Sequence, residues 1–152
     1  MAKNPLYPRK WFPKNPHKYV GDVNNIIVRS SWETRFLSWC DLNSSVIQYA
    51  SEETIVPYLC ETDNRMHRYF IDCSMKIKDS SGNISTYLVE IKPYHQTQPP
   101  VYPGKQTKRY INEATTYIKN KSKWKAAKRF AEDRKMKFII LDEYSLGIKK
   151  RK

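Results

Sequence analysis

The feature that most constrains this sequence is a pair of alternating segments joined by a short polar turn. Residues 67–78 alternate between two faces, residues 84–92 do so again, and Ser80-Ser81-Gly82 lies between them. Successive side chains of a strand point to opposite faces, so the two segments predict a β-hairpin. A three-residue loop of this kind uses a type I turn followed by a left-handed residue, and Gly82 occupies that position.

The length of this loop determines which residues face each other across the hairpin. With residues 80–82 as the loop, Asp79 pairs with Asn83, and Asp72 then lies opposite Glu90. Directly opposite residues point to the same face of an antiparallel pair, and Lys92 shares the face of Glu90. A two-residue loop would instead place Asp72 opposite Ile91, and a bulge would also change the register.

Two neighbouring carboxylates and an ammonium group indicate a particular chemistry. The carboxylates repel each other unless a proton or a cation lies between them. A hard divalent ion such as Mg²⁺ prefers oxygen ligands. A lysine beside it can stabilise charge on a phosphate or help to deprotonate an attacking water. The alternative is a Lys–Glu pair on an exposed face of the sheet, with Asp72 solvated.

A helix is predicted upstream of the hairpin. Ser30-Ser31-Trp32-Glu33 matches the capping box and predicts a helix that starts at Ser30. Its apolar face comprises Trp32, Phe36, Leu37, Trp39 and Cys40, and Glu33 falls within the same arc. An acid on a buried face needs a partner. Glu33 therefore either caps the helix or directs its carboxylate to a buried polar site.

The remaining pattern predicts the fold class and the division of the chain. Short strands are expected near 46–50, 54–59 and 137–141, and helical segments over 105–119 and from Ser122 onward. This order of elements, a helix, then strands, then helices and a last strand, favours an α/β sandwich. In such a fold, helices flank a small mixed β-sheet. We expect the core domain over residues 29–145, between an extended basic arm (1–28, rich in proline and aromatic residues) and a basic tail (146–152). The aromatic residues of the arm are expected to pack on the core, with a partner or nucleic acid as alternatives; they are Tyr7, Trp11, Phe12 and Tyr19.

The formal charge of +13 is unevenly distributed along the chain. Residues 1–21 carry +5, residues 22–104 carry −3, and residues 105–152 carry +11. An acidic middle between basic ends suits an enzyme acting on phosphodiesters, because carboxylates hold the cation and bases hold the backbone. The alternatives are that the basic ends confer solubility or bind another acidic partner. The bases expected to contact double-stranded DNA, unless they form a solvated helix face, are Lys105, Lys108, Arg109, Lys121, Lys125, Lys128 and Arg129.

Other classes of protein are not favoured. The three cysteines include no CxxC pair, so neither a disulfide framework nor a structural zinc site is expected. No apolar run approaches the roughly 18 residues that span a bilayer, and the N-terminus lacks an apolar signal segment. The sequence therefore predicts a soluble protein of intracellular origin, with no membrane partner.

Ile71-Asp72 followed by Val89-Glu90-Ile91-Lys92 resembles the signature of the PD-(D/E)xK nucleases, with Ile71 in place of the proline. The segment from His67 to Asp72 resembles the TnsA-like transposase endonuclease branch of that superfamily. The Met-Ala-Lys-Asn-Pro start, residues 30–36 and Lys92-Pro93-Tyr94 extend a resemblance to the head completion nucleases of T-even-like bacteriophages over nearly the whole chain.

This resemblance implies a restriction-endonuclease-like sandwich and Mg²⁺-dependent, or Mn²⁺-dependent, endonuclease activity on DNA. It implies Asp72, Glu90 and Ile91 as the metal-binding set, Lys92 as catalytic base or charge stabiliser, and Glu33 in support. It places the protein in the host cytoplasm during phage assembly or on the virion, acting on packaged DNA ends, with head, portal or neck proteins as partners.

Two other functions fit parts of the sequence. One is a structural protein of the virion that binds DNA through its basic ends and keeps a nuclease-like fold without activity. The other is a basic RNA-binding module, which leaves the acidic hairpin unexplained and has no stacking motif.

Overall fold

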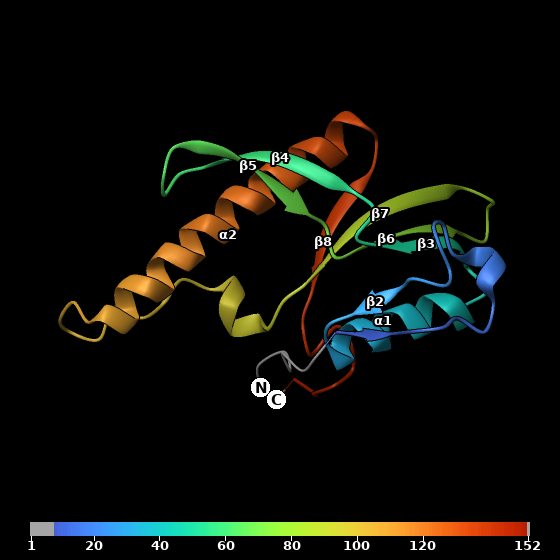
Figure 1. Ribbon diagram of the computed structural model, residues 1–152, viewed down its shortest axis with the longest axis horizontal. Coiled ribbons are helices and arrows are strands. Elements are labelled where there is room, and N and C mark those ends of the chain that lie inside the picture. Colours follow the sequence, from blue (N-terminus) through green and yellow to red (C-terminus); the bar gives the residue numbers. More distant parts are fainter. Residues whose placement is uncertain (1–7, 152) are drawn as a thin grey trace.

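A computed structural model describes residues 8–151 of the chain (Figure 1). The elements in this part are β1 (Arg9–Lys10), η1 (Pro16–Lys18), β2 (Ile27–Val28), α1 (Ser31–Leu42), β3 (Val46–Ser51), β4 (Ile55–Cys60), β5 (Arg65–Phe70), β6 (Cys73–Lys78), β7 (Ile84–Ile91), η2 (Tyr94–Thr97), α2 (Lys108–Asp133) and β8 (Lys137–Leu141). None of the helices among these residues is long and apolar enough to span a bilayer.

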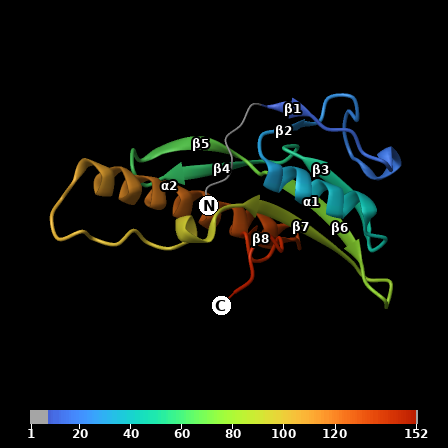
Figure 2. The same ribbon diagram turned by 90° about the horizontal axis from the view of Figure 1, so that it is seen from below.

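A mixed four-stranded sheet of order β3-β6-β7-β8 divides the molecule into two layers. β6 pairs antiparallel with β3 and β7, whereas β8 runs parallel to β7. On one face, α1 and β2 pack against residues of β6 and β7 such as Met75 and Val89. On the other, α2 and the β4–β5 hairpin pack on Leu88 (Figures 1 and 2). The sandwich of helices around a small mixed sheet is the predicted restriction-endonuclease-like fold, which is confirmed.

The β6–β7 hairpin has the predicted register. Cys73 pairs with Val89 and Lys78 pairs with Ile84, and the Asp79 N–H donates to the Asn83 carbonyl over 2.9 Å. The Gly82 N–H closes the turn on the Asp79 carbonyl over 3.0 Å, and Gly82 has φ of +85°, in the left-handed region that favours glycine. The three-residue loop therefore brings Asp72, one residue before β6, to the level of Glu90.

The single strand expected over residues 67–78 is wrong. β5 ends at Phe70 and belongs to a separate two-stranded sheet with β4, and β6 begins at Cys73. At the break, the Ile71 N–H donates to the Thr54 carbonyl and the Glu52 N–H donates to the Asp72 carbonyl, each over 3.0 Å. The alternation of side chains continues through the break, which is why the sequence pattern did not reveal it.

The two helical segments expected after residue 105 form one continuous helix, so that expectation is also wrong. α2 has 26 residues, and Ser122, expected to open a second helix, lies inside it with its hydroxyl donating to the Ile118 carbonyl. The N-terminal half of α2 extends beyond the sheet (Figure 1). Two apolar residues of this half, Ile111 and Ile118, are consequently exposed.

α1 begins as predicted, with the Ser30 hydroxyl accepting a hydrogen bond from the Glu33 N–H over 3.2 Å. Four of the five expected core residues of this helix are buried, but Trp39 is 46% exposed. Trp39 lies at the edge of the apolar arc, where its ring stacks on Phe36 with 6.2 Å between ring centroids and the other face meets solvent. Glu33 is buried, as its position in the arc predicted.

The described part of the arm packs on the core. Trp11 and Tyr19 make edge-to-face contacts with Tyr49 of β3, whereas Phe12 is exposed. Tyr7 lies outside the described residues. At the other end, Leu146 and Ile148 contact the same cluster around α1. The domain boundaries at residues 28 and 145 stay predictions.

Candidate active site

Asp72 and Glu90 meet where the β4–β5 hairpin turns into the central sheet. The Ile91 N–H donates to Asp72 Oδ2 over 2.8 Å, so the main chain of β7 orients this carboxylate. Glu90 is buried, and the negative charge of Asp72 acts on its carboxyl group. The structure thus brings together the two acids that the loop length predicted to face each other.

Glu90 is surrounded by groups that orient its two oxygens. The Tyr69 hydroxyl donates a hydrogen bond to Oε2, and Lys92 Nζ lies 3.8 Å from Oε1. Burial, and after it the charge of Asp72, raises the pKa of Glu90 to about 8. The two acids together therefore favour a proton or a cation between them near neutral pH.

Two residues of this site were not found from the sequence. Tyr69 lies at the end of β5, and Lys123 of α2 places its Nζ 5.5 Å from the centroid of the Tyr69 ring. Burial, and after it the charge of Lys92, lowers the pKa of Lys123. The available signal was helical spacing, because Lys123 stands one turn before the inward-facing Ala127.

Glu33 lies in the first turn of α1, where its side chain binds the main chain just before the helix. Its Oε2 accepts a hydrogen bond from the Arg29 N–H over 3.2 Å. The pKa of Arg29 is raised mainly by its hydrogen bond to Glu52, and the charges of Glu33 and Asp72 raise it further. The charges of both carboxylates thus act on one guanidinium, and a supporting role of Glu33 at the site stays a prediction.

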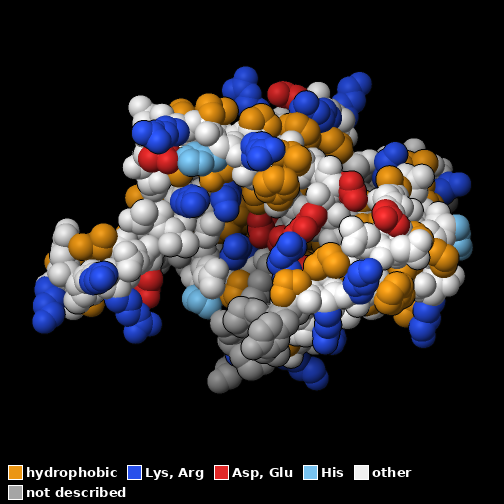
Figure 3. Space-filling view, viewed as in Figure 1, with side chains coloured by type: hydrophobic (Ala, Val, Ile, Leu, Met, Phe, Trp, Pro, Cys, Tyr) orange, Lys and Arg blue, Asp and Glu red, His pale blue; other side chains and the backbone are white. Residues whose placement is uncertain are grey.

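The bases expected to bind DNA fall into separate groups. Lys121, Lys125 and Lys128 line a hollow of about 510 Å³ with Trp124 and Phe138. At about 100° per residue, these lysines lie roughly 140–160° around α2 from Lys123, so they do not face the two carboxylates. Lys105, Lys108 and Arg129 are exposed elsewhere along this segment. In Figure 3, acidic side chains gather at the centre of the face with basic ones beside them.

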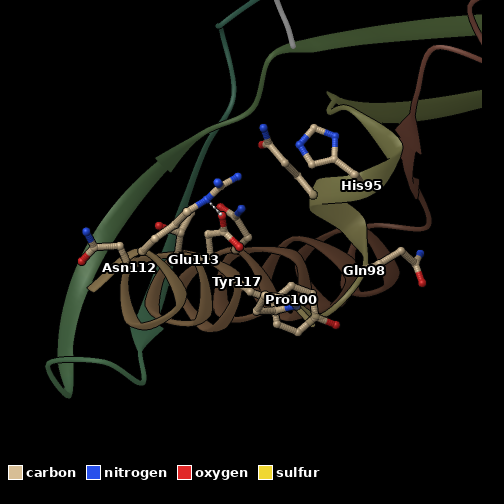
Figure 4. A pocket seen from close by; sticks show the side chains of 10 residues that line it. His95, Gln98, Pro100, Asn112, Glu113 and Tyr117 are labelled. Carbon is tan, nitrogen blue, oxygen red and sulfur yellow. Dashed lines mark hydrogen bonds and ion pairs between the residues drawn. The ribbon is translucent and has the colours of Figure 1, made fainter. Parts of the chain in front are cut away.

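Arg109 lies at a second hollow of about 500 Å³, between η2 and the projecting half of α2 (Figure 4). It forms an ion pair with Glu113 at 2.9 Å. Asn112, Glu113 and Tyr117 of α2 line this hollow together with His95 and Gln98 of the segment after β7. Neither Asp72 nor Glu90 lines this hollow.

Comparison of the chain with known proteins identifies the family to which it belongs. Residues 43–143 match the family model described as TnsA-like endonuclease N terminal. The chain belongs to the TnsA-like endonuclease family. It is also 46% identical over 144 residues to the head completion nuclease of Enterobacteria phage T4, a match that covers 92% of this chain and 93% of the relative. The predicted membership of the PD-(D/E)xK nucleases, in their TnsA-like branch, is confirmed.

The TnsA-like segment contains the whole cluster except Glu33. It runs from the residue after α1 to the second residue after β8 and thus includes Tyr69, Asp72, Glu90, Lys92 and Lys123. Glu33 lies on α1, outside the matched range.

The donor groups of this TnsA-like chain suit a hard divalent cation. Asp72 and Glu90 offer carboxylate oxygens, and the apolar Ile91 can contribute only its main-chain carbonyl. The N–H and C=O of one strand residue point to the same side, so the Ile91 carbonyl points to the side on which its N–H meets Asp72. The two carboxylates and this carbonyl would supply three oxygen donors, the kind of ligand that Mg²⁺ prefers.

Proposed function

We propose that this chain is a metal-dependent DNA endonuclease that hydrolyses phosphodiester bonds with Mg²⁺, or alternatively Mn²⁺. The observation that supports it most is the pairing of Asp72 with the buried Glu90, because neighbouring carboxylates repel each other unless a proton or a cation lies between them. The Ile91 N–H that holds Asp72 and the Tyr69 hydroxyl that holds Glu90 fix the pair before a metal arrives.

Each residue of the cluster has a defined task in this proposal. Asp72, Glu90 and the Ile91 carbonyl hold the metal, which when bound polarises the phosphate and makes a coordinated water more acidic. Lys92 lies close enough to Glu90 to act beside the same phosphate, either as the base for the water or as a stabiliser of developing charge. Lys123 adds a second, partly buried positive charge. Glu33 supports the arrangement through Arg29.

The same proposal extends to the biological setting. The phage T4 relative is named a head completion nuclease, and it matches almost the full length of this chain. We infer that this protein acts on packaged DNA ends during completion of phage heads in the host cytoplasm, with head, portal or neck proteins as partners. The bases along this segment would bind the sugar–phosphate backbone of duplex DNA; they are Lys121, Lys125 and Lys128 at one hollow, Arg109 at the hollow of Figure 4, and the exposed Lys105, Lys108 and Arg129.

Cleavage of supercoiled plasmid with Mg²⁺ tests the enzymatic proposal. We expect nicking that a chelator abolishes and that falls at least about 100-fold in Asp72→Asn, Glu90→Gln and Lys92→Met. Lys76→Met, an exposed lysine on the neighbouring strand β6, is the matched control and should keep the parent activity. Unchanged cleavage by all three site variants would disprove the proposal.

The strongly basic segment 105–152 also fits a non-catalytic structural protein of the virion that binds DNA. That function predicts salt-sensitive binding of duplex DNA and no metal-dependent cleavage at any protein concentration. The plasmid assay separates the two functions directly.

A further inference from the structure

Three potential metal ligands of different chemistry converge at the tip of the β4–β5 hairpin. Cys60 is the last residue of β4, Asp63 lies in the turn, and His67 lies on β5. A thiol sulfur, a carboxylate oxygen and an imidazole nitrogen from these residues lie within 4.8 Å of one another. Asp72, Glu90 and Lys92 take no part in this group.

The backbone of the hairpin determines this convergence. Tyr58 pairs with His67 and Cys60 pairs with Arg65, so Cys60 and His67 share the face of the hairpin that packs on α2. Asn64 has φ of +58°, and its N–H donates to the Cys60 carbonyl over 2.7 Å, which closes the turn.

Hydrogen bonds hold the side chains in place as well. Asp63 Oδ1 accepts from the Arg65 N–H over 3.0 Å, which leaves Oδ2 at 2.7 Å from His67 Nε2. Cys60 Sγ lies 3.0 Å from the Thr62 hydroxyl oxygen, so the thiol has a polar neighbour although the residue is buried. The three groups are thus arranged by the turn itself.

The combination of sulfur, nitrogen and oxygen donors selects the class of ion. Thiolate and imidazole favour zinc-like transition metals, whereas Mg²⁺ takes oxygen ligands. In a tetrahedral zinc site, ligand atoms lie roughly 3.3–3.6 Å apart. The Asp63–His67 pair therefore needs to open by only about 0.6–0.9 Å as a metal replaces the shared proton, and water can complete the coordination.

We propose that Cys60, Asp63 and His67 form a structural site for a zinc-like transition metal at the tip of the β4–β5 hairpin. The sequence does not predict this site, because the spacing Cys-x₂-Asp-x₃-His contains no CxxC pair. This inference does not depend on the proposed nuclease activity.

Such a site would stiffen the strand that supplies Tyr69. A two-stranded hairpin alone is only marginally stable, so a metal at its tip would add a restraint to the packing of the hairpin on α2. The ring of His67 stacks on Tyr58 with 5.7 Å between centroids, and Tyr58 contacts Tyr69 edge-to-face at 6.4 Å. The metal would therefore restrain Tyr58 and Tyr69, and the Tyr69 hydroxyl donates a hydrogen bond to Glu90.

Titration of the full-length Glu90→Gln variant with Co²⁺ and then Zn²⁺ tests the proposal, because this background weakens the other metal site. We expect one equivalent of Co²⁺ to give a thiolate-to-cobalt charge-transfer absorption that Zn²⁺ displaces. His67→Gln and Asp63→Asn should each weaken Zn²⁺ binding at least about tenfold. Both side chains are partly exposed, so the folded chain should tolerate the changes.

The matched controls are His95→Gln and Glu61→Gln, an exposed histidine elsewhere and an exposed acid in the same turn. Both should bind Zn²⁺ as the Glu90→Gln parent does. Zn²⁺ should also raise the melting temperature of the parent more than that of His67→Gln. Absence of the thiolate absorption, or equal Zn²⁺ affinity in His67→Gln and His95→Gln, would overturn the proposal.

Discussion

Glu90 makes the metal-free protein sensitive to pH. Its pKa rises from an ordinary value of 4.5 to about 8 on folding, first because of burial and then because of Asp72. Between these values the folded state binds more protons than the unfolded chain, so the free energy of unfolding falls as the pH increases. The stabilising effect of the neutral carboxyl is complete below the unfolded pKa and is lost as the pH passes the folded pKa.

Glu90→Gln removes this dependence, because an amide does not titrate. In chelator, we expect the variant to match the parent at about pH 5 and to exceed its unfolding free energy by about 2 kcal/mol or more near pH 9. Urea unfolding at both pH values measures the difference. Glu132→Gln, at an exposed position of α2, should follow the parent throughout. A Glu90→Gln curve parallel to that of the parent would contradict this account.

At the scale of single elements, the β6–β7 hairpin was predictable because its register depends on local chemistry. Gly82 and the count of residues between Asp79 and Asn83 determine the pairing, and both can be read from the sequence. The break at Ile71-Asp72 was not predictable, since it arises where β5 leaves the central sheet to pair with β4. Alternation alone does not say which sheet a strand joins.

We expect the two flanks of α2 to serve different functions, catalysis on one and general DNA binding on the other. Lys123 faces Tyr69, whereas Lys128 faces the hollow beside Phe138. We expect Lys123→Met to lower the single-turnover rate of plasmid cleavage about 10- to 100-fold at saturating protein, because it removes a charge beside the reacting phosphate. Lys128→Met should weaken DNA affinity and its salt dependence but leave the saturated rate unchanged.

Both substitutions remove one charge and keep an apolar stem, so each serves as the control for the other. Equal saturated rates for Lys123→Met and the parent would remove Lys123 from the site. A rate loss confined to Lys128→Met would reverse the assignment of the two flanks.

At the scale of the whole molecule, the sequence predicted the layers and the carboxylate pair but not the contacts between distant elements. Tyr69 and Lys123 reach Glu90 only when the β4–β5 hairpin packs on α2, and neither residue forms a local pattern with Asp72 or Glu90. The arm gives a second example. Its prolines indicated an extended segment, yet the residue that anchors it, Asp41, lies on α1 and belongs to no motif.

Asp41 joins the arm, α1 and β3 through one buried carboxylate. It accepts hydrogen bonds from the Lys14 N–H over 2.9 Å, the Asn15 N–H over 3.2 Å and the Tyr49 hydroxyl over 2.9 Å. Lys18 reinforces the junction, because its ammonium group donates to the Cys40, Asp41 and Asn43 carbonyls at the end of α1. Removal of the carboxylate would leave the buried Tyr49 hydroxyl and the part-buried Lys14 and Asn15 N–H groups without this acceptor.

We expect Asp41→Ala to lower the free energy of unfolding by about 3 kcal/mol, since each orphaned buried donor costs about 1–3 kcal/mol. Asp133→Ala, at the exposed end of α2, should change it by less than about 0.5 kcal/mol. Urea unfolding provides the measurement. Because Asp41 contacts the layer opposite Tyr69 and Lys123, plasmid cleavage well below the unfolding transition should be unchanged. A large loss of cleavage without a loss of stability would mean that the arm acts at the site rather than in the fold.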